Sequence, residues 1–209
     1  MPINYLVRAD VIDIRTDTPQ PTDQYLIDTN VWAFLVYTRL ALGNRPPSNA
    51  KVTAYSTFVN QALTVGSTLR RCGLTLAELA HLIEKTEREI YVQANPVAPP
   101  QTKEFRHNFQ AERGNVVTEI RSAWSQVKAI ATPADVLVND ALTDAVITRI
   151  QTQSLDVYDL FLSEAGSAAG IAHVVTDDGD YCCIPGIQMF TSNQSVLAAA
   201  QAQGRLIVR

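Results

Sequence analysis

The chain alternates short, unbroken apolar runs with longer stretches in which apolar residues recur every three or four positions. Unbroken runs of this length predict strands buried on both faces, and the longer spacing predicts helices that bury one face. Strands are expected at residues 25–27, 68–72, 171–176 and 187–191. Helices are expected at residues 31–42, 50–65, 74–91, 103–131, 139–153, 156–169 and 192–203. Strands that alternate with helices predict an α/β fold with a parallel sheet.

Two parts of the chain stand outside this alternation. The N-terminal arm, residues 1–23, contains an alternating stretch that is compatible with a strand and then a polar run, TDTPQPTDQ, that breaks it. The pattern assigns no role to this arm. An extra helical region spans about residues 93–153, and its long helix at residues 103–131 is weakened at Gly114 and broken at Thr132-Pro133. The length of 209 residues predicts one domain that carries this region as an elaboration.

Composition narrows the class of protein. Apolar residues make up 46% and charged residues 18%, which is typical of a globular chain with a sizeable core. No apolar run is long enough to predict a membrane span, and the first residues lack the layout of a signal peptide. The three cysteines are Cys72, Cys182 and Cys183, an odd number without zinc-ligand spacing. These features favour a cytoplasmic protein without a disulfide framework.

Acidic and basic residues are segregated along the chain, although the net charge is only −4. Residues 154–204 contain six acids and no Lys or Arg, so this segment needs either open water or cations. Basic residues that could contact the phosphates of a nucleic acid lie elsewhere. They are Arg70, Arg71, Lys103, Arg106, Arg113, Arg121 and Lys128. The alternative for each of them is a solvated helix face that offsets neighbouring glutamates.

Three of the acids follow strands. Asp28 ends the first buried strand, and Asp178 and Asp180 come just after the strand at residues 171–176. If these strands are neighbours, the three acids share the edge of the sheet where α/β proteins bind ligands. Each acid also has a structural explanation. Asp28 could cap the following helix, and the segment 177–180 could be a turn in which Gly179 takes a positive φ.

Two more acids lie near helix starts. Glu78 closes a Thr75-x-x-Glu78 capping box, so it could serve only to begin a helix. Asp156 and Asp159 share one helix face, and one of them could be its cap. Four or five carboxylates at one edge would repel each other unless divalent cations were bound. Ligands that are all oxygen favour Mg²⁺ or Mn²⁺ over zinc.

Four motifs in this order resemble the PIN-domain family of metal-dependent nucleases. The first is Leu26-Ile27-Asp28-Thr29-Asn30, and the second is Thr75-Leu76-Ala77-Glu78-Leu79. The third is Asp159 with a run of small residues that ends in Gly170, eleven positions later, which selects Asp159 over Asp156 as the inward acid. The fourth is Val175-Thr176-Asp177-Asp178-Gly179-Asp180-Tyr181. The resemblance covers residues 24–91 and 155–204, and it does not cover the N-terminal arm or the extra helical region.

The resemblance implies a three-layer α/β/α fold and the chemistry of the family. Asp28, Glu78, Asp159 and Asp178 would hold one or two Mg²⁺ or Mn²⁺ ions, with Asp180 as a further ligand and Asn30 and Thr176 as supports. The activity would be endoribonucleolytic hydrolysis of RNA phosphodiester bonds. A toxin of a toxin–antitoxin pair is one role that this implies, with an antitoxin protein or a second copy of the chain as partners.

Two alternatives stay open at this stage. A PIN-like module without a metal could bind RNA or protein and not cleave it, and the long region outside the resemblance motivates this hypothesis. A phosphatase with an aspartyl nucleophile is the second alternative. It would need Asp-x-Asp after the first strand, whereas Asp28 is followed by Thr29-Asn30.

Overall fold

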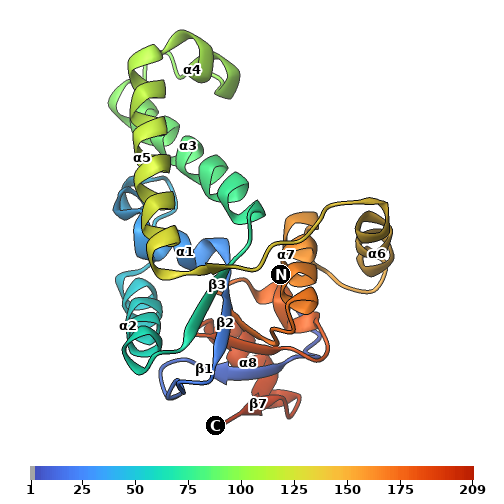
Figure 1. Cartoon of the computed structure of the whole chain (residues 1–209). Helices are drawn as coiled ribbons and strands as arrows, with labels where there is room; N and C mark the ends of the chain where they lie inside the picture. The colour runs from blue at the N-terminus through green and yellow to red at the C-terminus, as the bar shows by residue number, and fades with distance from the viewer. Residues whose placement is uncertain (1–2) are drawn as a thin grey trace.

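The computed structural model describes residues 3–209 and is built on a parallel sheet (Figure 1). Within these residues the sheet has seven strands in the order β4-β3-β2-β5-β6-β1-β7, and every neighbouring pair is parallel. The strands are β1 Asp10–Asp13, β2 Gln24–Ile27, β3 Thr68–Arg71, β4 Thr132–Pro133, β5 His173–Val175, β6 Gln188–Thr191 and β7 Leu206–Ile207. The predicted α/β fold with a parallel sheet is confirmed.

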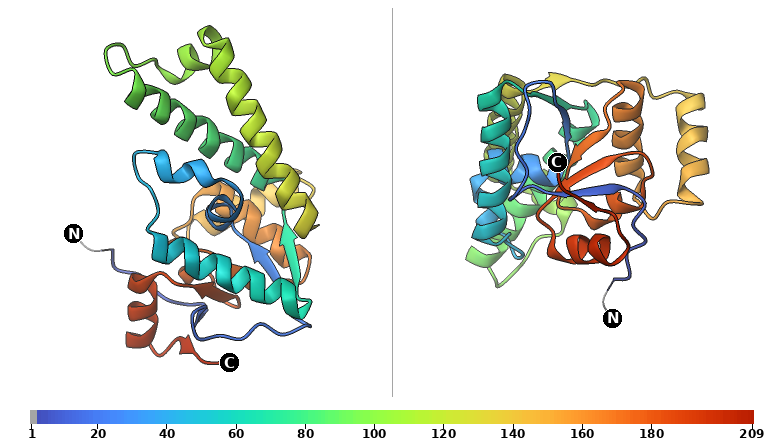
Figure 2. Two further views of the ribbon diagram at one scale, coloured as in Figure 1. Left: turned by 90° about the vertical axis from the view of Figure 1, so that its left-hand side faces the viewer. Right: turned by 90° about the horizontal axis from the view of Figure 1, so that it is seen from below.

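Helices cover both faces of the sheet. The α-helices are α1 Thr29–Val36, α2 Asn49–Val65, α3 Leu74–Ala94, α4 Thr102–Asn108, α5 Gln110–Ile130, α6 Asp140–Ile150, α7 Val157–Ala168 and α8 Gln194–Ala202. Two short 3-10 helices are η1 Thr38–Leu42 and η2 Gly179–Cys183. Side chains alternate between the faces of each strand, so Tyr25 and Ile27 join one core and Leu26 joins the other. Helices α1, α2, α3 and α5 complete the first core, and α7 and α8 complete the second, which gives three layers (Figure 2).

The N-terminal arm has a structural role that its sequence did not reveal. Strand β1 lies between β6 and β7, with Val11 opposite Met189 on one side and Leu206 on the other. Val11 and Ile12 are buried and contribute to opposite cores. The arm therefore completes the sheet at the end where the C-terminal strand also pairs.

The extra helical region projects from the sheet. Helices α3 and α5 pack side by side and extend away from it, and α4 lies at their far end (Figure 1). The prediction of one helix across residues 103–131 is wrong, because α4 and α5 are separated at Phe109 and the helix is intact at Gly114. Phe109 has φ −113° and ψ 74°, and its ring centroid lies 5.1 Å from that of Tyr91 on α3. Packing of this aromatic ring decides where the helix breaks.

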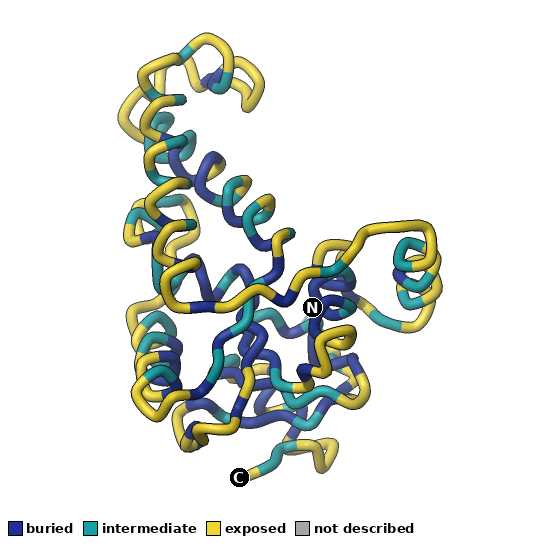
Figure 3. Tube along the Cα trace, viewed as in Figure 1, coloured by how far each residue is buried: buried dark blue, intermediate teal, exposed yellow. Residues whose placement is uncertain are grey.

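Burial follows these layers. The sheet and the helix faces against it are buried, whereas α4, α6 and the loops that lead to them are mostly exposed (Figure 3). The Thr132-Pro133 break is also a short edge strand, since Ala134 N donates to the carbonyl of Arg71 at 2.7 Å. Across residues 3–209, none of the helices is sufficiently long and apolar to span a membrane.

Candidate metal site

Strands β2 and β5 are neighbours, as the prediction of a shared edge required. Ile27 is paired with Val175, so the next residues, Asp28 and Thr176, lie side by side at the carboxyl ends of the two strands. Asp28 is only 2% exposed, and the backbone N–H of Asp28 donates to the carbonyl of Val175 at 3.1 Å. The first acid of the candidate site is thus fixed by the sheet itself.

Both carboxylate oxygens of Asp28 accept hydrogen bonds. Oδ1 accepts from the backbone N–H of Thr29 at 2.6 Å, so Asp28 does cap α1. Oδ2 accepts from Asn30 Nδ2 at 2.6 Å and from the Thr176 hydroxyl at 2.6 Å. The capping explanation is therefore correct for this residue, and Asn30 and Thr176 hold the second carboxylate oxygen in place.

Thr176 also connects Asp28 to the second acidic segment. Its hydroxyl accepts from the backbone N–H of Asp178 at 2.9 Å, and Asp178 Oδ1 accepts from the N–H of Asp180 at 2.9 Å. A turn is present here, but Gly179 does not have the positive φ that we expected. A side chain at position 179 would instead collide with Tyr5, because an added Cβ would lie 2.3 Å from its hydroxyl oxygen. The glycine allows the N-terminal arm to pack on the acidic turn.

Glu78 faces the site and does not form the expected capping box. Helix α3 has Gly73 at its N-cap with no side-chain capping bond, and the Thr75 hydroxyl has no hydrogen-bond partner. Glu78 Oε2 accepts instead from the hydroxyl of Thr29 at 2.5 Å. Tertiary packing of α3 against α1 therefore brings the glutamate beside Asp28.

Asp156 and Asp159 divide their roles as expected. Asp156 caps α7 by accepting from the backbone N–H of Asp159 at 3.0 Å. Asp159 is 5% exposed, and its Oδ1 accepts from the hydroxyl of the buried Tyr181 at 3.0 Å. Asp159 is therefore the inward acid of this pair.

The pKa values of these carboxyl groups are shifted by burial and by the closeness of the groups to one another. Burial, followed by repulsion from Glu78 and Asp178, raises the pKa of Asp28 to about 7. Burial, followed by repulsion from Asp28, raises the pKa of Asp159 to about 9. The pKa values of Glu78 and Asp180 are also raised, by burial first and then by neighbouring aspartates. Desolvation and like charges each disfavour the ionised form, so ionising all of these groups near neutral pH is unfavourable without a compensating positive charge.

No side chain of the described residues neutralises this charge by an ion pair. The Lys and Arg residues that form ion pairs within residues 3–209 contact other acids. A cation from solution would supply the missing charge, and a donor set made only of oxygen fits Mg²⁺ or Mn²⁺. The carboxylates of residues 3–209 do not, however, converge on a ready-made coordination site. Loading would require side-chain rotations around the firmly held Asp28.

Asp177 behaves differently from its neighbours. It forms an ion pair with Lys51 of α2 at 2.6 Å, and its Oδ1 accepts from the Tyr55 hydroxyl at 3.1 Å. Lys51 therefore offsets the charge of Asp177. Sequence reasoning missed Lys51 and Tyr55, since no local motif connects them to a residue more than 120 positions away.

Tyr55 is a buried hub behind the site. Its oxygen lies 2.9 Å from the carbonyl of Thr176 and 3.0 Å from Thr191 Oγ1, and it accepts from the N–H of Ser192 at 3.1 Å. Asn193, the N-cap residue of α8, donates through Nδ2 to the carbonyl of Asp177 at 2.8 Å. These contacts fix the loops after β5 and β6 relative to α2.

The basic residues proposed for nucleic-acid contact lie in different places. Arg106 and Arg113 both pair with Glu84 of α3, at 2.5 and 3.4 Å. Arg70 donates to Gln24 at 2.9 Å on β2, and Arg71 lies over the ring of Trp124 at 5.1 Å. Lys103 is exposed on α4. Arg106 and Arg113 thus lie on the projecting helices, whereas Arg70 and Arg71 lie at the carboxyl end of β3.

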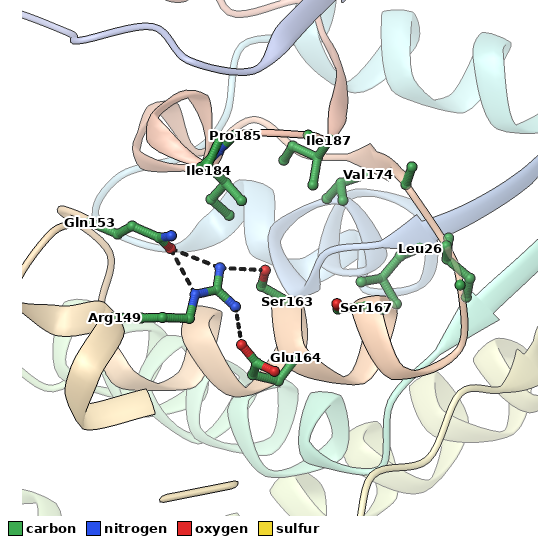
Figure 4. Close-up of a pocket in the computed structure, with 15 residues that line it drawn as sticks. Leu26, Arg149, Gln153, Ser163, Glu164, Ser167, Val174, Ile184, Pro185 and Ile187 are labelled. Atoms are coloured by element: carbon green, nitrogen blue, oxygen red, sulfur yellow. Dashed lines mark hydrogen bonds and ion pairs between the residues drawn. The ribbon is translucent and has the colours of Figure 1, made fainter. Parts of the chain in front are cut away.

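A cavity of about 360 Å³ lies beside the carboxyl-terminal half of α7 (Figure 4). It opens near the amino-terminal ends of β5 and β6, and none of the predicted site residues lines it. Its Arg149 already contacts Gln153, Ser163 and Glu164. The cavity therefore has no connection with the chemistry that the sequence predicts.

Comparison with known proteins gives structural likenesses only. No family model matches the chain, and no curated protein matches it. A solved structure of VapBC2 from Rickettsia felis, bound to a DNA fragment from their promoter, aligns with 80% of this chain and 98% of that chain, at 14% identity and a TM-score of 0.47. FitAcB from Neisseria gonorrhoeae aligns with 81% of this chain and 99% of that chain, at 17% identity and a TM-score of 0.43. At this identity and TM-score, the similarity to both proteins concerns the course of the chain and carries no statement about its chemistry.

Proposed function

We propose that the protein is a Mg²⁺- or Mn²⁺-dependent endoribonuclease whose metal ligands are Asp28, Glu78, Asp159, Asp178 and Asp180. The observation that carries the proposal is the approach of these carboxylates to one another, with Asp28 and Asp159 buried and the other three half-buried, without an ion-pair partner among residues 3–209. Burying uncompensated like charges is costly, so their presence together favours a cation-binding role. The resemblance to PIN-domain nucleases supplies the substrate class, RNA.

When bound, the ion would lower the pKa of a coordinated water and stabilise negative charge on the leaving oxygen. The protein's own residues position the ligands. Asp28 is held by three donors, and Thr176 connects it to Asp178. The Thr29 hydroxyl donates to Glu78, and the Thr29 backbone N–H donates to Asp28, so Thr29 positions two of the acids. Such fixed orientation of ligands is the usual task of residues around a metal site.

The Tyr181 hydroxyl has a comparable role at Asp159. The Tyr181 hydroxyl donates to Oδ1 of Asp159. Among residues 3–209, no group donates a hydrogen bond to Oδ2 of Asp159. Tyr181 is fully buried, and burial raises its pKa well above the ordinary value, so it stays a donor at neutral pH. No side chain is required as the nucleophile in this arrangement, because water serves that purpose.

The biological role and partners belong to the same proposal. A toxin of a toxin–antitoxin pair, acting in the cytoplasm, is the role that the sequence resemblance implies. Its partners would be an antitoxin protein and a second copy of the chain. A reading frame for a small protein next to this gene would support this role, and co-purification of the two products would test it.

The activity is tested with single-stranded and structured RNA in Mn²⁺ or EDTA. We expect cleavage only with metal, and we expect Asp28→Asn to abolish it. Asp144→Asn is the matched control, because it makes the same chemical change at an exposed position of α6. Cleavage that survives in EDTA or in Asp28→Asn would contradict the proposal, as would the absence of cleavage by the unmodified protein.

The second candidate is a PIN-like module that binds RNA or protein without cleaving it. The absence of a ready-made coordination geometry among residues 3–209 favours this alternative. Calorimetric titration with Mn²⁺ separates the two functions. Saturable binding that is lost in Asp28→Asn supports the nuclease, and no binding at millimolar metal supports the module.

A further inference from the structure

A groove of about 680 Å³ begins at the acidic site and continues along the projecting helices. We call it the α3–α5 groove. Its polar and aromatic lining comprises Glu78, His81, Glu84, Arg106, Arg113, Asp156 and Tyr158. The acids at one end belong to the candidate metal site or adjoin it, and the arginines at the other end belong to the extra helical region. One continuous surface thus connects two parts of the molecule that lie far apart in sequence.

The order of charges along the groove follows from helix geometry. Glu78, His81 and Glu84 are three residues apart on α3, so they lie on one face of the helix and form a row that leads away from the sheet. Arg106 and Arg113 approach the far end of this row and pair with Glu84. A polyanion lying in the groove would therefore place one phosphate near a guanidinium group and another near the metal site.

The two arginines remain available to a ligand. Their side chains are 40% and 39% exposed, although both contact Glu84. Glu84 itself is buried, so the two guanidinium groups compensate its charge. Arg106 uses Nε and Nη2 for these contacts and Arg113 uses Nη1, so each keeps further N–H groups that do not contact Glu84. A phosphate can accept charge-assisted hydrogen bonds from these remaining N–H groups while Glu84 keeps its own contacts. Glu84 would then hold the arginines in position with or without a bound ligand.

Tyr158 indicates which kind of nucleic acid fits. It is 51% exposed, lies in the first turn of α7, and lines the groove near Asp156 and Glu78. An exposed aromatic ring beside a phosphate-binding site is a stacking platform for a base, and only an unpaired base can present its face to it. This feature favours single strands over duplexes.

We propose that the α3–α5 groove binds single-stranded RNA, with Arg106 and Arg113 on backbone phosphates and Tyr158 against an unpaired base next to the cleaved bond. This inference rests on the proposed nuclease function and adds the substrate-binding surface. In this arrangement the extra helical region, through α4 and α5, extends the binding surface along the RNA strand.

Binding is measured by fluorescence anisotropy with a labelled single strand of about ten nucleotides, a length in the range that such surfaces cover. In an Asp28→Asn background, we expect Arg106→Ala/Arg113→Ala to weaken binding about tenfold and to reduce the slope of log Kd against log salt by about 1.4, the value for two lost phosphate contacts on a single strand. Arg45→Ala/Lys85→Ala removes two positive charges at exposed positions outside the groove and should change Kd less than about twofold.

Two further variants separate ligand binding from helix packing. Glu84→Gln removes a negative charge beside the phosphate position, so RNA should bind as tightly or more tightly, whereas a purely structural role of the ion pairs predicts weaker binding. Tyr158→Ala should weaken binding several-fold, and Tyr158→Phe should not, because stacking needs only the ring. In Mn²⁺-dependent cleavage by the otherwise unmodified protein, Arg106→Ala/Arg113→Ala should raise KM and leave kcat nearly unchanged.

The outcomes distinguish this inference from the proposed function. If the protein cleaves RNA and the Arg106/Arg113 double variant binds and cleaves like the control, the groove is not the RNA-binding surface. If the protein binds RNA through these arginines but never cleaves it, the groove is supported and the nuclease proposal fails. Equal affinity for a duplex of the same length would overturn the preference for single strands.

Discussion

Asp159→Asn should stabilise the metal-free protein while it destroys metal binding. Asp159 is 5% exposed, and its pKa is raised to about 9 by burial first and then by Asp28 and other acids. Asparagine keeps the oxygen that accepts from the Tyr181 hydroxyl and cannot ionise. Its amide group can also donate to the neighbouring carboxylates. The substitution therefore removes an electrostatic cost without removing the one hydrogen bond.

The magnitude follows from the two pKa values. In the unfolded chain Asp159 has its ordinary pKa of 3.8, so it loses its proton as the pH rises above about 4. In the folded protein it keeps the proton up to about pH 9. Stability is therefore lost progressively between these pH values. Each pH unit corresponds to about 1.4 kcal/mol, which gives an upper limit of about 4 kcal/mol at pH 7.

Asp28 reduces the gain that will be observed. Asp28 and Asp159 repel each other, so part of the cost belongs to the pair and not to Asp159 alone. We expect Asp159→Asn to raise the free energy of unfolding by about 1–3 kcal/mol at pH 7, which corresponds to several degrees in Tm for a chain of this size. The gain should shrink to near zero at pH 4, where the unfolded carboxyl is also protonated.

The assay is urea unfolding of both proteins in EDTA at pH 4, 5.5, 7 and 8, with Asp144→Asn as the control at an exposed position. Saturating Mn²⁺ should then stabilise the unmodified protein and have little effect on Asp159→Asn, because ligand binding stabilises only the state that binds it. A variant that is less stable than the unmodified protein at pH 7 in EDTA would refute the reasoning. A gain that does not depend on pH would refute it equally.

Three other substitutions probe the surroundings of the site. Thr176→Val removes the hydroxyl that holds Asp28, so Mn²⁺ affinity should fall about 10–100-fold by calorimetry, and unchanged affinity would show that Thr176 has no orienting role. Tyr55→Phe removes a buried hydroxyl with several partners and should cost about 1–3 kcal/mol in urea unfolding; a loss below about 0.5 kcal/mol would contradict its role as a hub. Gly179→Ala places a methyl group against Tyr5 and should cost about 1–3 kcal/mol, unless the arm can shift, in which case amide exchange near Tyr5 should accelerate.

Local signals determined most of the secondary structure. Strand β2 is an unbroken apolar run followed by a polar cap, and this pattern requires burial on both faces whatever the rest of the fold does. The break at Phe109 shows where such signals fail. Gly114 is the weakest helix former locally, but the ring of Phe109 packs against Tyr91, and that contact lies outside any local window.

The sequence by itself determined the fold class and named the candidate acids, because strand periodicity and residues that follow strands or begin helices are local properties. Only the tertiary structure decided that β2 and β5 are neighbours and that Asp28 accepts from Thr176, 148 positions later. It also decided that Lys51 forms an ion pair with Asp177. The five acids of the candidate metal site have no ion-pair partner among residues 3–209, because the Lys and Arg residues that form ion pairs there contact acids elsewhere. Charge compensation acts over a few ångströms in space, and the order of residues along the chain does not encode which groups come that close.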